Sequence, residues 1–169
     1  PTQESIEEIR NALNDSLLEL RNISKGLALP NLEAMSIQDI VHNAVKAHQH
    51  RTNTEVDLHM DLSEIGINPY MLVKITLFRS IQEGLTNAFR HADGIGQNVS
   101  VHSDEKNLYI SIEDRGPGFD FKNISKNGDS LGLNGLRERI KSLGGQFSVS
   151  SQHNHGTVLH ILLPLLEKE

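Results

Sequence analysis

Hydrophobic residues recur every third or fourth position along four segments of the chain, a spacing that is typical of amphipathic helices. The segments are residues 4–25, 36–45, 68–92 and 133–143. Helix-boundary signals support them: Ser36 with Asp39 matches a capping box, Pro69 would suit a first turn, and Gly144 follows the last segment. We therefore expect four helices.

Five other segments alternate hydrophobic and polar residues, as strands with one buried face do. They are residues 56–60, 98–103, 107–114, 146–151 and 157–164. Short turns separate the second strand from the third and the fourth from the fifth, which favours antiparallel pairing. The pattern predicts an α+β two-layer sandwich, with a mixed, mostly antiparallel sheet and helices on one face.

The first helical segment carries a single apolar seam, of the kind that packs in a coiled coil or a helical bundle. A helix of this kind cannot bury its seam alone, so a partner helix is implied, either from a second copy or from sequence outside this chain. Gly26 and Pro30 then interrupt the pattern. We expect residues 1–30 to be a helical appendage and residues 31–169 to be the sandwich domain.

Composition narrows the possible functions. A chain of 169 residues with 37% hydrophobic residues suits one folded domain with an appendage. The net charge of −6 and the lack of a basic stripe argue against direct binding to nucleic acid. The absence of cysteine excludes disulfides, thiolate zinc sites and a cysteine nucleophile, and fits a reducing compartment. The sequence has no apolar run long enough to span a bilayer and does not begin with a signal peptide. Since it lacks an initiator Met, we expect a fragment of a longer protein.

A column of polar residues marks the third helical segment. Glu83, Asn87 and His91 recur every fourth position, so a carboxylate, a carboxamide and an imidazole share one side of the helix. By itself such a column is compatible with a solvated helix face as well as with a functional site. The residues expected to face the core from the other side are Phe78, Ile81, Leu85, Ala88 and Phe89.

The stretch "EDRGPGF" places two glycines directly after a predicted strand that ends at Asp114. Gly116 and Gly118 permit positive φ and the close approach of another group. An ordinary turn, with one φ angle set by Pro117, is the alternative interpretation.

The stretch "SLGLNGLRERI" places Gly132 and Gly135 around the start of the last predicted helix. Free backbone N–H groups and the helix dipole favour an anion such as phosphate at that position. A flexible helix entry is the alternative. Arg137 and Arg139 could assist an anion, or else pair with Glu138 or lie in solvent.

The order of these signals resembles the ATP-binding domain of sensor histidine kinases, within the GHKL superfamily that includes chaperone, mismatch-repair and type II topoisomerase ATPases. "QEGLTNAFRHA" is similar to the N box of that family, "DRGPGF" to its G1 box, "LGLNGLRERI" to its G2 box and "GTVLHILLP" to its closing strand. The short stretch between Phe119 and Gly128 is similar to the subfamily with a short lid. The resemblance covers roughly residues 37–166 and implies the Bergerat ATP-binding fold.

The resemblance implies a role for each matching residue. Asn87 would supply a side-chain oxygen to Mg²⁺, and Glu83 would orient or activate the attacking group. Arg90 and His91 would lie near the phosphates. Asp114 would accept a hydrogen bond from the adenine amino group, which rejects guanine. The remaining cofactor-binding positions implied are Gly116, Gly118, Gly132, Leu133, Gly135 and Thr157, the last through a water or else as a plain strand threonine.

Three departures from the family pattern accompany the match. Arg115 stands where many relatives carry Asn or Asp, and Ser130 replaces the first glycine of the G2 box. The family's phosphate acceptor is a histidine followed by an acidic residue, and none of the nine histidines here has that neighbour. His42 and His48 are therefore expected to be ordinary surface or packing residues. Residues 1–30 resemble the second helix of the family's dimerisation and phosphotransfer hairpin, and residues 31–169 its catalytic domain.

The resemblance implies transfer of the ATP γ-phosphoryl group to a histidine absent from this chain, which alone would bind ATP and Mg²⁺ without autophosphorylation. The implied partners are a second copy, through the helical hairpin, and a response-regulator receiver domain. The implied location is cytoplasmic, including the cytoplasmic portion of a membrane-anchored sensor. The alternatives are a superfamily clamp, which the short lid disfavours, and a regulatory module without kinase activity.

Overall fold

The computed structural model describes residues 30–62, 69–118 and 130–165, with the backbone alone for Ser130 and Leu131. The chain divides into two units, Pro1–Asn31 and Leu32–Glu169, and the second is described below. The expected N-terminal helix lies outside the described residues. The elements of the second unit are, in order, α2 (Ile37–Thr52), β1 (Asp57–Leu62), α3 (Met71–Ala92), β2 (Asn98–Ser103), β3 (Asn107–Asp114), α4 (Ser130–Ser142), β4 (Gln146–Ser151) and β5 (Thr157–Pro164).

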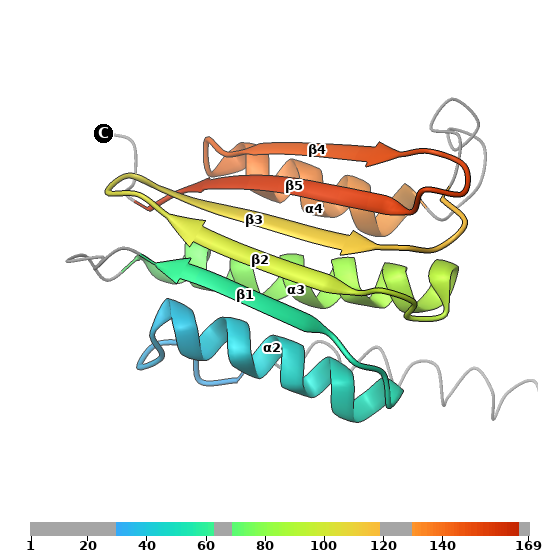
Figure 1. Ribbon diagram of the computed structural model, residues 1–169. Coiled ribbons are helices and arrows are strands. Elements are labelled where there is room, and N and C mark those ends of the chain that lie inside the picture. The colour runs from blue at the N-terminus through green and yellow to red at the C-terminus, as the bar shows by residue number, and fades with distance from the viewer. Residues whose placement is uncertain (1–29, 63–68, 119–129, 166–169) are drawn as a thin grey trace, which may run out of the picture. The chain divides into compact units, whose positions relative to one another are not determined.

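The five strands form one sheet in the order β1-β2-β3-β5-β4, and helices α2, α3 and α4 cover the same face of it (Figure 1). β1 and β2 are parallel because α3 forms the crossover between them, whereas the other three pairs are antiparallel. The predicted mixed, mostly antiparallel sheet with helices on one face is confirmed. The bounds expected for β2, β3, β4 and β5 match those observed.

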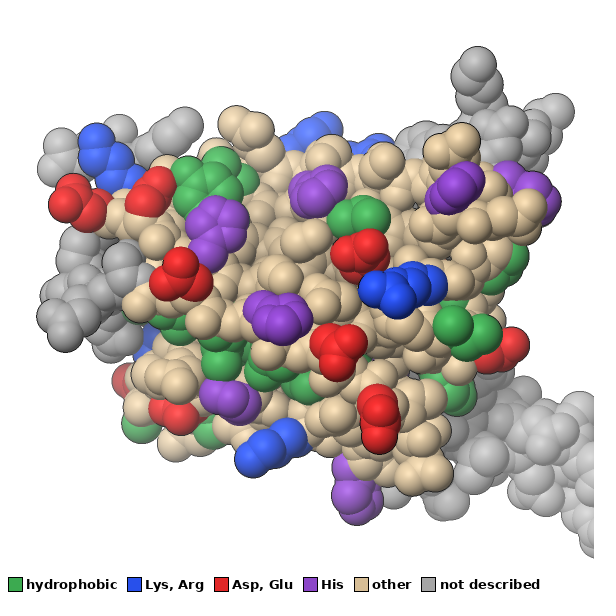
Figure 2. Space-filling view, in the orientation of Figure 1, with side chains coloured by type: hydrophobic (Ala, Val, Ile, Leu, Met, Phe, Trp, Pro, Cys, Tyr) green, Lys and Arg blue, Asp and Glu red, His purple; other side chains and the backbone are tan. Residues whose placement is uncertain are grey.

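Alternation along the strands separates the core from the outer face of the sheet. In β3, Leu108, Ile110 and Ile112 are buried beneath the helices, while the residues between them point the other way. Figure 2 shows that outer face, over which histidine, acidic and uncharged side chains are spread. No described helix has both the length and the apolar character needed to cross a bilayer.

Helix α2 is fixed at both ends by polar contacts. The expected capping box is confirmed: Ser36 Oγ accepts the Asp39 N–H at 3.1 Å, and Asp39 Oδ2 accepts the Ser36 N–H at 3.2 Å. Near the other end, His48 is 2% exposed and lies within hydrogen-bonding distance of Gln97, whose amide also donates to the Leu85 carbonyl. This buried network ties α2 to α3 and to the chain entering β2.

Two expectations about α3 are wrong at its ends. The helix begins at Met71 with Tyr70 as its N-cap, so Pro69 precedes the helix instead of occupying its first turn. Tyr70 has an extended backbone, which delays the first helical residue. Phe89 was expected in the core but is 40% exposed, whereas Ala88 and Ala92 in the same turns of α3 are buried. Phe89 instead meets the edge of the His48 ring at a centroid distance of 6.3 Å.

Helix α3 packs closely on the sheet at Gly84. A Cβ at this position would lie 2.6 Å from Ile112 Cδ1 and 3.2 Å from Leu159 Cδ1, which belong to β3 and β5. Both contact residues are buried, so neither can move aside without disturbing the core. A glycine at this point therefore sets how near the helix lies to the sheet.

We expect Gly84→Ala to lower the free energy of unfolding by about 1–3 kcal/mol, because the added methyl group overpacks the core. Gly135→Ala is the matched control, since a Cβ there meets nothing within 4 Å. Alanine favours a helix over glycine by about 1 kcal/mol, so the control should unfold at equal or higher urea concentration. Urea titrations followed by circular dichroism measure both changes, and equal effects would contradict the close packing at Gly84.

Candidate functional site

The polar column on α3 is partly covered, unlike a uniformly solvated helix face. Glu83 and Asn87 are half-buried, whereas His91, one turn further on, is exposed. Asn87 Nδ2 donates to Glu83 Oε1 at 3.4 Å. The carboxamide oxygen of Asn87 consequently faces away from that carboxylate, and among the described residues no hydrogen bond to it is found. This oxygen has the chemistry of a ligand for a hard cation.

The first turn of α4 lies against the Glu83 carboxylate. A Cβ on Gly132 would collide with Glu83 Oε1 and would lie 2.9 Å from Glu83 Cδ. Only glycine fits this position while the carboxylate stays where it is. The structure thus brings together two of the predicted site residues that are 49 positions apart in the sequence.

Helix α4 begins at Ser130, three residues before the expected start. Packing of Leu133, Leu136 and Ile140 on the core outweighs the low helix propensity of the glycines. Gly132 still lies in the first turn, where backbone N–H groups have no partner within the helix. Gly135 lies in the second turn, so the expectation that it flanks the helix start is wrong.

Asp114, the last residue of β3, is 8% exposed. The Gly116 N–H donates to Asp114 Oδ1 at 2.9 Å, and Thr157 is its partner across the β3–β5 ladder. Burial raises the pKa of Asp114 above its usual value, although the backbone N–H groups of Gly116 and Thr157 and the nearby His91 act in the opposite direction. A carboxylate held in this way can accept a further hydrogen bond from a ligand.

The two glycines after Asp114 fit where other residues would clash. A Cβ on Gly116 would collide with the Ala92 side chain and lie 2.8 Å from Ala92 Cα, at the end of α3. Gly118 has φ 59°, and a Cβ there would lie 2.9 Å from the Gly156 carbonyl oxygen. The turn after β3 therefore fits between the end of α3 and the loop that enters β5.

The sequence pattern of the family described as histidine kinase-, DNA gyrase B- and HSP90-like ATPases matches residues 72–167, which is more than half of the chain. The chain belongs to this ATPase family. The match spans α3, the glycine-bearing turn after Asp114, α4 and β5, which are the elements that form the contacts described above.

Sensor kinases are among the curated relatives of this family member. It is 30% identical over 166 residues to the signal transduction histidine-protein kinase/phosphatase DegS of Brevibacillus brevis, covering 97% of this chain and 42% of the relative. It is 28% identical over 162 residues to the oxygen sensor histidine kinase NreB of Staphylococcus carnosus (strain TM300), covering 96% and 45%. The chain thus spans less than half the length of these relatives, and it has the ATP-binding catalytic domain of the sensor histidine kinase type.

Three further predicted site residues, Arg90, Leu133 and Thr157, have different surroundings in the structure. Arg90 is exposed beside the column, and Leu133 is half-buried against the core, so its side chain belongs to the packing. The Thr157 hydroxyl lies 3.1 Å from Ser151 Oγ, so Thr157 reaches Asp114 through its backbone. The predicted water bridge between the Thr157 hydroxyl and Asp114 remains a prediction.

Sequence reasoning missed three residues that shape this region of the ATPase domain. Ala92 backs onto Gly116, and Gly156, with φ 77°, leaves room for the Asp114 carbonyl oxygen. Arg79 lies one helical turn before Glu83, and its guanidinium interacts electrostatically with that carboxylate. The four-residue spacing of the column, extended one step towards the N-terminus, would have found Arg79.

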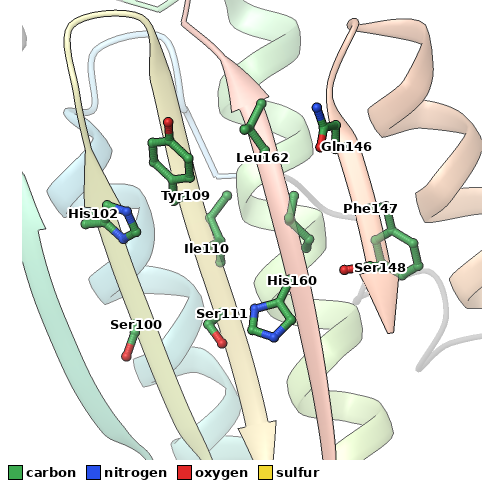
Figure 3. Close-up of a pocket in the computed structure, with 11 residues that line it drawn as sticks. Ser100, His102, Tyr109, Ile110, Ser111, Gln146, Phe147, Ser148, His160 and Leu162 are labelled. Atoms are coloured by element: carbon green, nitrogen blue, oxygen red, sulfur yellow. The ribbon is translucent and has the colours of Figure 1, made fainter. Parts of the chain in front are cut away.

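The outer face of the sheet has a hollow that is separate from these residues. It is lined from β2, β3, β4 and β5 by residues that include His102, Tyr109, Ser111 and His160, which point away from the helices (Figure 3). None of the predicted site residues lines it. The candidate site on the helix side and the hollow therefore lie on opposite faces of the sheet.

We expect Asp114→Asn to weaken ATP binding at least about tenfold. The side-chain amide presents N–H donors where the carboxylate presents only acceptors, so a donor group of the ligand loses its hydrogen-bond partner. The same change should leave the unfolding temperature equal or higher, since burial raises the pKa of Asp114 and disfavours its charged form. In the wild type, ATP binding should be lost as the pH falls and Asp114 becomes protonated. Because the pKa of Asp114 is raised, this loss should come at a higher pH than it would for an exposed aspartate. Calorimetry and thermal unfolding test this, with exposed Glu105→Gln as control, and parallel losses of binding and stability would contradict it.

Proposed function

We propose that this chain supplies the ATP-binding catalytic part of a sensor histidine kinase, which passes the ATP γ-phosphoryl group to a histidine outside the chain. The observation that carries the proposal is the convergence on α3 of two stretches distant in the sequence. Gly132 contacts Glu83 in the middle of the helix, and Gly116, bonded to Asp114, contacts Ala92 at its end. These contacts arrange a carboxylate, a carboxamide and two glycine-bearing turns along one helix.

In this proposal the adenine ring binds beside Asp114. The carboxylate accepts the exocyclic amino group of adenine, while Gly116 and Thr157 hold it from the protein side. Guanine presents a carbonyl oxygen there, which would oppose a second acceptor and leave both groups unpaired. Gly118 leaves room beside the base.

Asn87 would hold a Mg²⁺ ion together with the phosphates, and Glu83 lies beside Asn87. Mg²⁺ binds oxygen ligands and retains several waters, so one carboxamide oxygen is a sufficient protein ligand. Asn87 fits because its amide nitrogen is already directed at Glu83, which leaves the oxygen for the ion. When bound, Mg²⁺ would offset phosphate charge, and Glu83 would orient the attacking group.

The phosphates would run along the first turns of α4. Gly132 offers a backbone N–H. Leu133 would contribute only its backbone, because its side chain packs on the core. Gly135 has no side chain, so it leaves open space on the surface of the helix. Arg90 and His91, both exposed, would add positive charge or donors beside the column.

Phosphoryl transfer needs little covalent chemistry from the protein, so positioning and electrostatics account for most of the catalysis. We assign residues 1–30 to the second helix of a dimerising hairpin, and the acceptor histidine to the first helix of that hairpin. A response-regulator receiver domain would then take the phosphoryl group from that histidine. These assignments rest on the sequence resemblance and on the sensor-kinase relatives.

Nucleotide titrations by calorimetry test the proposal. We expect ATP to bind with Mg²⁺ in clear preference to GTP, and Asn87→Ala to remove most of the Mg²⁺-dependent gain in affinity, because the ion loses its protein ligand. Asn43→Ala, an exposed carboxamide on α2, is the matched control. Equal affinity for ATP and GTP, or unchanged binding in Asn87→Ala, would contradict the site, and no nucleotide binding at all would favour a regulatory module.

A further inference from the structure

A buried histidine joins helix α2 to the segment that enters β2. His48 is 2% exposed, and its Nε2 atom lies 3.3 Å from Gln97 Oε1 and 3.2 Å from Gln97 Nε2. Its other ring nitrogen, Nδ1, lies 3.4 Å from Arg51 Nη2. Because a guanidinium can only donate, Nδ1 accepts, and the ring proton lies on Nε2, which donates to Gln97 Oε1. These contacts therefore require a neutral His48.

Gln97 is the residue through which His48 acts on the rest of the domain. It is also buried; its amide donates to the Leu85 carbonyl at 3.1 Å, and its Oε1 accepts the Thr54 hydroxyl at 3.0 Å. Both polar groups of this side chain are thus bonded inside the protein. The position of Gln97 is consequently set from α2 by His48, from α3 by Leu85 and from the chain before β1 by Thr54.

The loop of residues 93–97, which ends at Gln97, lies against Arg115. The Ile95 carbonyl accepts the Arg115 N–H at 2.9 Å. A Cβ on Gly96, where φ is 62°, would lie 2.7 Å from Arg115 Cγ, so the backbone of this loop touches the Arg115 side chain. Because Gln97 follows Gly96 directly, a shift of Gln97 would disturb both contacts.

Arg115 places these contacts beside the group proposed to bind adenine. It lies between Asp114 and Gly116 in the sequence, and the Gly116 N–H donates to Asp114 Oδ1 at 2.9 Å. A shift of the Arg115 backbone would therefore redirect the Asp114 carboxylate and the N–H that holds it. A continuous series of contacts thus links His48 on α2 to the adenine end of the site.

Protonation of His48 would break this arrangement. Nδ1 would then carry a proton directed at the Arg51 guanidinium, which is held in place by a hydrogen bond of 3.0 Å from Nη2 to the Thr86 hydroxyl. Two positive charges would meet where the ring has almost no contact with solvent. Towards α3 the ring meets the edge of Phe89, which carries no charge. Of the charged groups that the structure describes, Arg51 is the one that acts on His48.

The direction of the pH effect follows from the burial of the ring. Burial lowers the pKa of His48 below its ordinary value of 6.5, the hydrogen bond to Gln97 acts in the opposite direction, and Arg51 lowers the pKa further. A histidine that leaves this place for water regains its ordinary pKa. The neutral ring therefore stabilises the contact with Gln97 fully above pH 6.5, and this contribution is lost as the pH falls.

We propose that His48 is a positioning residue for the adenine end of the site. While neutral, it holds Gln97, and with it residues 93–97, against Arg115; once protonated, it releases them and weakens nucleotide binding. The inference rests on the proposed function, because that function places adenine beside Asp114. It makes the ATP affinity of the domain depend on a buried side chain of α2 that itself makes no contact with the nucleotide.

The test is calorimetry of the full chain with Mg²⁺·ATP and with Mg²⁺·ADP at about pH 7.5 and about pH 5.5, which bracket the ordinary titration of histidine. His48→Gln is the decisive variant, because its amide can donate to Gln97 as Nε2 does but takes up no proton in this range. His48→Leu removes the donor altogether. His50→Gln, which changes an exposed histidine on the same helix, is the matched control. Thermal unfolding at both pH values checks the fold of each variant.

We expect acidification to weaken wild-type binding of both nucleotides about threefold or more beyond its effect on His48→Gln, because that variant keeps the titration of Asp114 and loses only that of His48. His50→Gln should follow the wild type. His48→Leu should bind ATP and ADP about threefold or more less tightly at either pH, the loss typical of one hydrogen bond.

Identical pH profiles for the wild type and His48→Gln would overturn the role of His48 while leaving ATP binding by the domain intact. If His48→Leu does not fold, the comparison of the wild type with His48→Gln still decides the question. A wild type that binds neither nucleotide at about pH 7.5 would overturn this inference and the proposed function together.

Discussion

The contact between Gly84 and Ile112 is the constraint on which the site depends. A helix residue without a side chain lies on a buried strand residue, so α3 approaches β3 at a distance that any Cβ would increase. Glu83 and Asn87 flank this glycine on the helix, and Asp114 follows Ile112 by two residues on the strand. One packing contact therefore fixes the separation between the groups proposed for the metal and phosphates and the group proposed for adenine.

Two further contacts extend this arrangement along the helix. Gly132 against Glu83 places the start of α4 over the middle of α3, and Gly116 against Ala92 places the turn after β3 over its end. In both cases the backbone of a glycine lies where a Cβ would collide with a side chain of α3. The glycines of the family motifs thus act as packing residues that assemble the site, in addition to any contact they make with phosphate.

Much of the fold followed from the sequence because its strands alternate strictly and four of them have clear turn boundaries. Errors came at helix ends, which depend on packing: α4 extends back past Gly132, and near the end of α3 Ala88 and Ala92 are buried while Phe89 is exposed. The pairing of Glu83 with Gly132 could not be read from local pattern, since it joins residues remote in sequence. Family resemblance suggested their common site but gave no sign of Arg79, which the four-residue spacing of the column would have found.

The central claim is that one bound ATP touches the turn after β3 and the first turn of α4 at the same time. Amide hydrogen exchange measured with and without saturating Mg²⁺·ATP tests this claim most directly. The account predicts slower exchange on ATP binding at Gly116, at Gly132 and at Thr157 together, with no change on the outer-face strand residues around His102. Slower exchange confined to that outer face, or unchanged exchange at Gly116 and Gly132 under saturating nucleotide, would contradict it.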